Sequence, residues 1–129
     1  MEPASLDGFP ALAHDVLIVE DDPIIALDFE DTILGFGVKT VRSAGSVATA
    51  LAAIAARPPD IALLDVALAR EKSFAVAEQL DALKIPFVFV TGYGGNAGMP
   101  AAFAGRPRLG KPCPAEALEA ALRGAMQVR

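Results

Sequence analysis

The fold is decided by residues 16–22, whose sequence VLIVEDD joins an apolar run to three consecutive acids. A second apolar run at 61–64, IALL, also ends in a carboxylate, Asp65. Consecutive apolar β-formers are typical of strands buried on both faces, as in the parallel sheet of an α/β protein. Ligands bind just outside the carboxyl ends of such strands. We therefore expect the acids to form one carboxylate cluster there, whose mutual repulsion calls for a bound cation.

Composition narrows the class of protein. The 129 residues suit a single domain, and although 53% are hydrophobic, charges, Gly or Pro interrupt every apolar run. No run approaches the roughly 18 residues of a membrane span. The net charge of −5 disfavours nucleic-acid binding. The first residues do not resemble a secretory signal, and a single cysteine, Cys113, suits a reducing compartment. We expect a cytoplasmic protein that contacts neither membrane nor nucleic acid.

Apolar periods bounded by turn residues predict five strands, at about 15–20, 38–42, 61–65, 86–90 and 108–110. A helix is expected to follow the first strand, with Asp22 as its cap and Pro23 at its first position.

The apolar stripe of this helix contains Ile24, Leu27 and Leu34, and we interpret it as core. The helix should end at Gly35 and Gly37.

Further helices are expected from Ser46 to Pro58, near 73–83, and from Pro114 through Met126. Six of the 11 glycines lie between residues 92 and 110, so the fourth helix should be short or irregular. Strands alternating with helices predict a doubly wound α/β fold. We assign it to 15–129, with a leader at 1–14 and no second domain.

Polar residues follow four of the expected strands: the acids at 20–22, then Asp65, Thr91 and Lys111. In a parallel sheet all four face the same edge. A carboxylate such as Asp65 can attack a phosphoryl group and become an acyl phosphate. Asp21 and Asp65 can hold Mg²⁺, while the Thr91 hydroxyl and the Lys111 ammonium can stabilise phosphoryl oxygens. The pattern predicts phosphoryl transfer that depends on Mg²⁺.

In this order, at these strand ends, the residues resemble the receiver domain of bacterial response regulators over about 15–127. The segment FVTGY at 89–93 resembles the FATGUY subgroup, whose members are typically stand-alone receivers of alphaproteobacteria. The resemblance implies a flavodoxin-like (βα)5 fold with a five-stranded parallel sheet of order 2-1-3-4-5. It also implies a histidine kinase or phosphotransfer protein as donor.

The family likeness assigns roles to individual residues. Asp65 would be the phosphoacceptor, and Thr91 and Lys111 the phosphate sensors. The bond between Lys111 and Pro112 is often cis in the family. The implied Mg²⁺ site uses three acids and one backbone carbonyl: Glu20, Asp21, Asp65 and Ala67.

The chain departs from the family pattern at two places. Residues 66–73 lack the usual Pro-Gly or Asp-Gly after the phosphoacceptor, and we interpret the charged residues 70–72 as a solvated loop. The usual aromatic switch position is Arg108, so a threonine–aromatic switch of the usual form is not expected. Tyr93 is a candidate lid over the phosphate, or a packing residue.

Three functions remain open. The leading hypothesis is a non-enzymatic, stand-alone response regulator that signals to an unknown downstream protein, or acts as a phosphate sink. Its output surface would comprise 92–107, the fifth strand and the last helix, and would include Gly94, Arg108 and Cys113. A receiver-like interaction module that needs no phosphorylation is the second hypothesis. A Mg²⁺-dependent phosphohydrolase or topoisomerase-primase-type domain is the third. A homodimer is also left open.

Overall fold

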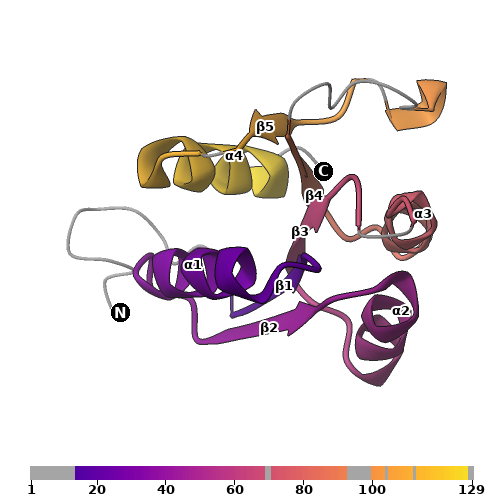
Figure 1. Ribbon diagram of the computed structural model, residues 1–129, viewed down its shortest axis with the longest axis horizontal. Helices are drawn as coiled ribbons and strands as arrows, with labels where there is room; N and C mark the ends of the chain where they lie inside the picture. The colour runs from indigo at the N-terminus through magenta and orange to yellow at the C-terminus, as the bar shows by residue number, and fades with distance from the viewer. Residues whose placement is uncertain (1–13, 69–70, 93–99, 104, 112, 128–129) are drawn as a thin grey trace.

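Five parallel strands form a single sheet in the order β2-β1-β3-β4-β5 (Figure 1). The computed structural model describes residues 14–68, 71–92, 100–103, 105–111 and 113–127. The observed order of the strands confirms the predicted flavodoxin-like order. The strands are β1 (Asp15–Val19), β2 (Thr40–Ala44), β3 (Ile61–Asp65), β4 (Phe87–Thr91) and β5 (Arg108–Gly110).

Helices cover both faces of the sheet, as expected for a doubly wound fold (Figure 1). On one face, α1 (Pro23–Leu34) and α4 (Ala115–Gln127) pack on side chains such as Ile18 and Leu63. On the other face, α2 (Val47–Ala56) and α3 (Phe74–Ala82) pack on the neighbouring side chains Leu17 and Leu64. Because successive side chains of a strand point to opposite faces, both faces of β1 and β3 are covered, and residues 16–19 and 61–64 are all apolar.

Caps begin the first two helices as the sequence predicts. The Asp22 side chain accepts hydrogen bonds from the amides of Ile24 and Ile25, and Pro23 occupies the first helical position. Ser46 forms a capping box with Thr49 at the start of α2. These caps satisfy amides that a helix leaves unpaired at its first turn, and they fix where each chain segment leaves the sheet.

Two expectations about side-chain placement and strand bounds are wrong. The stripe of Ile24, Leu27 and Leu34 is exposed, at 78%, 57% and 42%, so it is not core. A second stripe of α1, which includes Phe29 and Ile33, faces the sheet instead. The second strand occupies Thr40–Ala44 rather than 38–42, because Val38 packs into the core ahead of the strand.

The region expected to hold an irregular fourth helix contains, in its described part, a 3-10 helix at Ala101–Phe103. Phe103 is buried and packs against Phe74, Phe87 and Phe89. Tyr93 and Gly94 lie outside the described residues, as do Pro112 and residues 1–13 of the expected leader. The helices that are described are all too short or too polar to cross a membrane.

Candidate functional site

Three carboxylates meet at the carboxyl ends of β1 and β3. Val19 pairs with Leu64 in the parallel ladder, so the next residue of each strand, Glu20 and Asp65, must lie side by side. Oxygen atoms of Glu20, Asp21 and Asp65 all lie within 4.8 Å of one another. Glu20 and Asp65 are buried, at 4% and 6% exposure, and Asp21 is half-buried. The structure therefore brings together the three acids predicted to gather at this edge.

One ammonium group serves this cluster. Lys111 follows β5, and its backbone amide donates to the Thr91 carbonyl at 2.8 Å, which ties the residue to the end of β4. Its Nζ donates to Glu20 Oε1 at 2.8 Å and to Asp65 Oδ2 at 2.9 Å. Lys111 pairs with two of the three clustered carboxylates, so the described part of the site carries an excess of negative charge.

Burial and charge act against each other on these groups. Burial raises the pKa of the Glu20 carboxyl above its ordinary value of 4.5, and the neighbouring Asp65 charge adds to the increase, while the Lys111 hydrogen bond opposes it. Burial alone would lower the pKa of Lys111, but its two carboxylate partners outweigh that effect and raise it above 10.5. Lys111 therefore stays charged at neutral pH, whereas the environment of the Glu20 carboxyl disfavours its charged form.

The residues present fit a magnesium ion. Carboxylate and carbonyl oxygens are the ligands that Mg²⁺ prefers, and three carboxylates within 4.8 Å supply them. Ala67 forms an antiparallel bridge with Lys72. The ladder bonds beside this bridge run from the Ser73 amide to the Val66 carbonyl and from Leu68 to Glu71. The ladder thus leaves the Ala67 carbonyl unused, which is what a backbone metal ligand requires.

The structure also describes three of the other predicted residues: Thr91, Arg108 and Cys113. Thr91 ends β4, and its hydroxyl donates to the Leu109 carbonyl across a long 3.5 Å, so it points toward β5. Arg108 is exposed on β5. Cys113 packs partly against the core, and burial raises the pKa of its thiol, in keeping with a small packing residue. Tyr93 and Gly94 are outside the described residues.

Sequence reasoning missed the role of Glu71, which it treated as part of a solvated loop. The Glu71 carboxylate accepts a hydrogen bond at 3.0 Å from the amide of Val47, the first residue of α2. Leu68, whose backbone pairs with that of Glu71, is buried in the core. No local pattern signals a contact between residues 24 positions apart, so only the folded chain reveals it.

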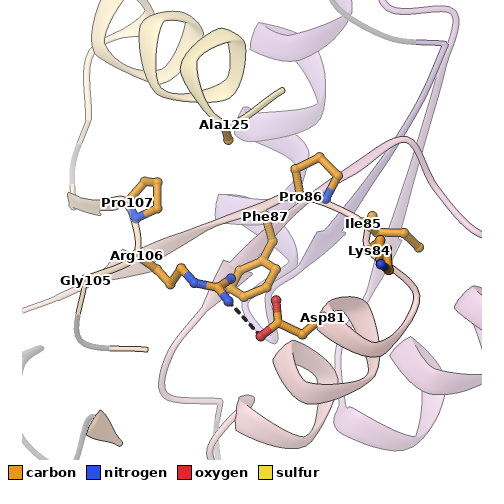
Figure 2. Close-up of a pocket in the computed structure, with 9 residues that line it drawn as sticks. All are labelled: Asp81, Lys84, Ile85, Pro86, Phe87, Gly105, Arg106, Pro107 and Ala125. Carbon is orange, nitrogen blue, oxygen red and sulfur yellow. Dashed lines mark hydrogen bonds and ion pairs between the residues drawn. The ribbon is translucent and has the colours of Figure 1, made fainter. Parts of the chain in front are cut away.

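A cavity of about 660 Å³ lies at the opposite, amino end of β4 and β5 (Figure 2). Two of its polar side chains pair with each other, since Arg106 forms a 2.7 Å ion pair with Asp81, and Arg106 lies 5.1 Å from the centre of the Phe87 ring. Figure 2 shows this pair beside an apolar lining that includes Pro86 and Pro107. The chemistry therefore concentrates at the carboxyl end and not in this cavity.

Comparison with known proteins places the chain in a family. A family model described as the response regulator receiver domain matches residues 16–123. The phyllosphere-induced regulator PhyR of Methylorubrum extorquens is 33% identical over 85 residues, which make up 64% of this chain and 32% of PhyR. The chain thus spans about a third of the length of that relative.

Two solved structures are similar over most of their length. The solution structure of SdrG from Sphingomonas melonis Fr1 is 40% identical, with a TM-score of 0.80, and the match covers 91% of this chain and 98% of SdrG. The BeF3-activated conformation of SdrG from Pseudomonas melonis Fr1 matches with a TM-score of 0.70, 40% identity and coverage of 85% and 97%. On the strength of the family match, the strand order and the strand-end residues, the chain belongs to the response regulator receiver domain family.

Proposed function

We propose that this receiver domain accepts a phosphoryl group on Asp65 in a reaction that needs Mg²⁺, and that it signals through contact with another protein. The observation that carries the proposal is the charge imbalance at the sheet edge, where three carboxylates cluster and the Lys111 ammonium pairs with two of them. Such a site attracts a divalent cation and, with it, an anionic phosphoryl donor. Transfer to a side chain makes the protein a stoichiometric acceptor, not an enzyme with a turnover substrate.

The proposed step uses groups already in contact. An oxygen of Asp65 attacks phosphorus as the bond from phosphorus to the donor's nitrogen or oxygen breaks, and the electron pair of that bond leaves with the donor. When bound, Mg²⁺ supplies positive charge that offsets the charge of the phosphoryl oxygens. Lys111, now 2.9 Å from Asp65 Oδ2, would move its hydrogen bond to a phosphoryl oxygen. The Thr91 hydroxyl would leave its long contact with the Leu109 carbonyl and donate a hydrogen bond to a second phosphoryl oxygen.

The similarity to SdrG supports this step. That protein has a BeF3-activated conformation. BeF3 resembles a phosphoryl group in shape and charge. The present structure matches the solution structure of SdrG from Sphingomonas melonis Fr1 with a TM-score of 0.80. Its TM-score against the BeF3-activated conformation is 0.70. We take the structure described above as the unphosphorylated form.

The donor is proposed to dock on the exposed stripe of α1. This helix begins directly after the acid cluster, and Ile24 and Leu27 are exposed at 78% and 57%. Asp28 and Asp31 are exposed on the same helix. An apolar stripe flanked by acids suits an amphipathic helix with basic flanks, as a histidine kinase or phosphotransfer protein in the cytoplasm could offer. Leu27→Glu should then slow transfer from a phosphorylated donor protein severalfold and leave phosphorylation by acetyl phosphate unchanged; equal slowing of both reactions would exclude this docking face.

The output is proposed to be a changed protein contact near β5 and the described part of 100–111. Phosphorylation can order a segment through new contacts with Thr91 and Lys111, both of which border this region. The downstream partner is proposed to be a protein recognised through this surface.

Intact-mass measurement tests the proposal. The protein is incubated with acetyl phosphate, with Mg²⁺ or with EDTA, and compared with Asp65→Asn and with Asp31→Asn, an exposed aspartate on α1. We expect one phosphoryl adduct on the unchanged protein and on Asp31→Asn, only with Mg²⁺, and none on Asp65→Asn. An adduct that persists in Asp65→Asn, or forms equally in EDTA, would reject the assignment.

A further inference from the structure

The segment after Asp65 folds into a small hairpin that determines where the Ala67 backbone lies. Its two arms are joined by the bond from the Ser73 amide to the Val66 carbonyl at 3.0 Å and by reciprocal bonds between Leu68 and Glu71. The Ala67 amide donates to Asp65 Oδ1 at 3.2 Å. The hairpin therefore sets the orientation of the peptide unit that carries the Ala67 carbonyl.

A two-stranded hairpin of this length is not stable by itself in water, so it needs anchors. Leu68 provides one, because its side chain is buried against the core and fixes which face of the hairpin points inward. Glu71 provides the other through its 3.0 Å bond to the Val47 amide. A carboxylate at the first turn of a helix is favoured by the helix dipole and by the charge of the hydrogen bond.

Glu71 thereby joins the two halves of the acid cluster. The helix it contacts, α2, begins just after β2, and the β2 residue Ala44 accepts a hydrogen bond at 3.0 Å from the Glu20 amide. On its other side, the Glu71 hairpin continues directly from Asp65. One surface carboxylate thus links the backbone that carries Glu20 to the backbone that carries Asp65 and Ala67.

We propose that Glu71 is a positioning residue for the cation site: its bond to the Val47 amide holds the 66–73 hairpin in the register that presents the Ala67 carbonyl to Mg²⁺. The inference rests on the proposed function, since it concerns the metal of that same site. Glu71 itself does not touch the ion. Residues that orient metal ligands in this indirect way typically change metal affinity when they are replaced.

Magnesium binding to the metal-free protein, followed by calorimetry, tests the proposal. The variants are Glu71→Ala, Glu71→Gln and a matched control, Glu78→Ala, which removes an exposed glutamate from α3. We expect Glu71→Ala to weaken Mg²⁺ binding by about tenfold. Glu71→Gln loses the same charge but keeps an acceptor oxygen, so its affinity should lie closer to that of the unchanged protein. Glu78→Ala should match the unchanged protein.

Amide hydrogen exchange provides a second readout that does not depend on the metal. In Glu71→Ala, without Mg²⁺, the amides of Leu68, Glu71 and Ser73 should exchange faster, while those of β1 and β3 should not change.

The outcomes separate the inference from the function on which it rests. Equal Mg²⁺ affinity in Glu71→Ala and the unchanged protein overturns the inference alone. Equal weakening in Glu71→Ala and Glu71→Gln also overturns it, because charge rather than the bond would then be the cause. No Mg²⁺ binding by the unchanged protein and by Glu78→Ala overturns the proposed function, and the inference with it.

Discussion

Buried carboxylates lie at both ends of β1, and the two ends balance their charge in opposite ways. At the amino end, the Asp15 carboxylate accepts three hydrogen bonds. Arg42 donates from Nε at 3.0 Å and from one terminal nitrogen at 2.9 Å, and Arg57 donates from Nε at 2.9 Å. Arg42 also donates to the carbonyls of Ala53 and Arg57. At the carboxyl end, three carboxylates cluster, and among the described residues the one ammonium paired with them, Lys111, contacts Glu20 and Asp65.

The difference separates a structural cluster from a reactive one. At the amino end, two guanidinium groups pair with one carboxylate. At the carboxyl end, excess negative charge and a lysine that can change partners leave the site able to accept a cation and a phosphoryl group. Substitutions at the two ends should therefore respond differently to Mg²⁺.

The largest stability effect is expected at the amino end. Arg42→Met removes both donors that Arg42 offers to Asp15 and leaves two backbone carbonyls without this partner. The free energy of unfolding should fall by about 3 kcal/mol, as when a buried ion pair loses one member. Urea denaturation measures this loss, and added Mg²⁺ should not reduce it. Arg57→Met is the control. Because the Arg57 side chain is 60% exposed, this substitution should lower the free energy of unfolding by less than about 1 kcal/mol.

The corresponding substitution at the carboxyl end should be recovered by the metal. Lys111→Met leaves Glu20 and Asp65 without their ammonium partner. We expect a loss of about 2 kcal/mol in EDTA, less than at Arg42 because the freed carboxylates can take up protons. Millimolar Mg²⁺ should restore most of the loss, since an ion that binds only the folded state stabilises it. A loss that Mg²⁺ leaves unchanged would show that the two ends are equivalent.

The pH dependence of stability sharpens the contrast. Since the pKa of Glu20 is raised above 4.5 in the folded state, the folded protein binds more protons than the unfolded chain from about that pH upward. The contribution of this group is full below 4.5 and is lost as pH rises through the raised value. Without metal, Tm of Glu20→Gln relative to the unchanged protein should therefore rise with pH from about 4.5 toward neutrality. A difference in Tm that stays constant over this range would contradict the buried-charge account.

The smallest effect is expected from Lys84, at the rim of the amino-end cavity. Its φ of 62° lies in the left-handed region, and the bonds from Lys84 to Asp81 and from Ile85 to Leu80 form the helix ending that favours glycine. Lys84→Gly should raise the free energy of unfolding by about 1 kcal/mol, measured by urea denaturation. The rate of phosphorylation by acetyl phosphate should not change, because this end takes no part in the chemistry; a slower rate would argue against that separation.

Much of the fold follows from local patterns that have a single interpretation. The strand predicted at 61–65 becomes β3 with the same bounds, because a continuous apolar run that ends in a carboxylate is typical of a strand buried on both faces. Asp22 is predicted as a helix cap and is found as one. The placement of acids at strand ends, and hence the gathering of Glu20, Asp21 and Asp65, follows from the same rule.

The rest depends on contacts that a local pattern does not contain. Helix α1 carries two apolar stripes, and the sequence does not show that the one containing Phe29 and Ile33 faces the sheet while Leu27 faces solvent. Glu71 is a charged loop residue by every local criterion, and its bond to Val47 exists only once α2 and the hairpin are packed. The metal ligands, phosphate sensors and output surface stay predictions until chemistry tests them.

Reductive trapping of the acyl phosphate tests the central claim most directly. The protein is treated with acetyl phosphate and Mg²⁺, reduced with borohydride and cleaved into peptides whose residues are read by mass spectrometry. Reduction converts a phosphorylated aspartate into homoserine, so the method reads out which of the clustered acids reacted. The account predicts homoserine at position 65 only, and none without Mg²⁺. Homoserine at position 21, or an unmodified Asp65 under conditions in which Mg²⁺ binds, would contradict it.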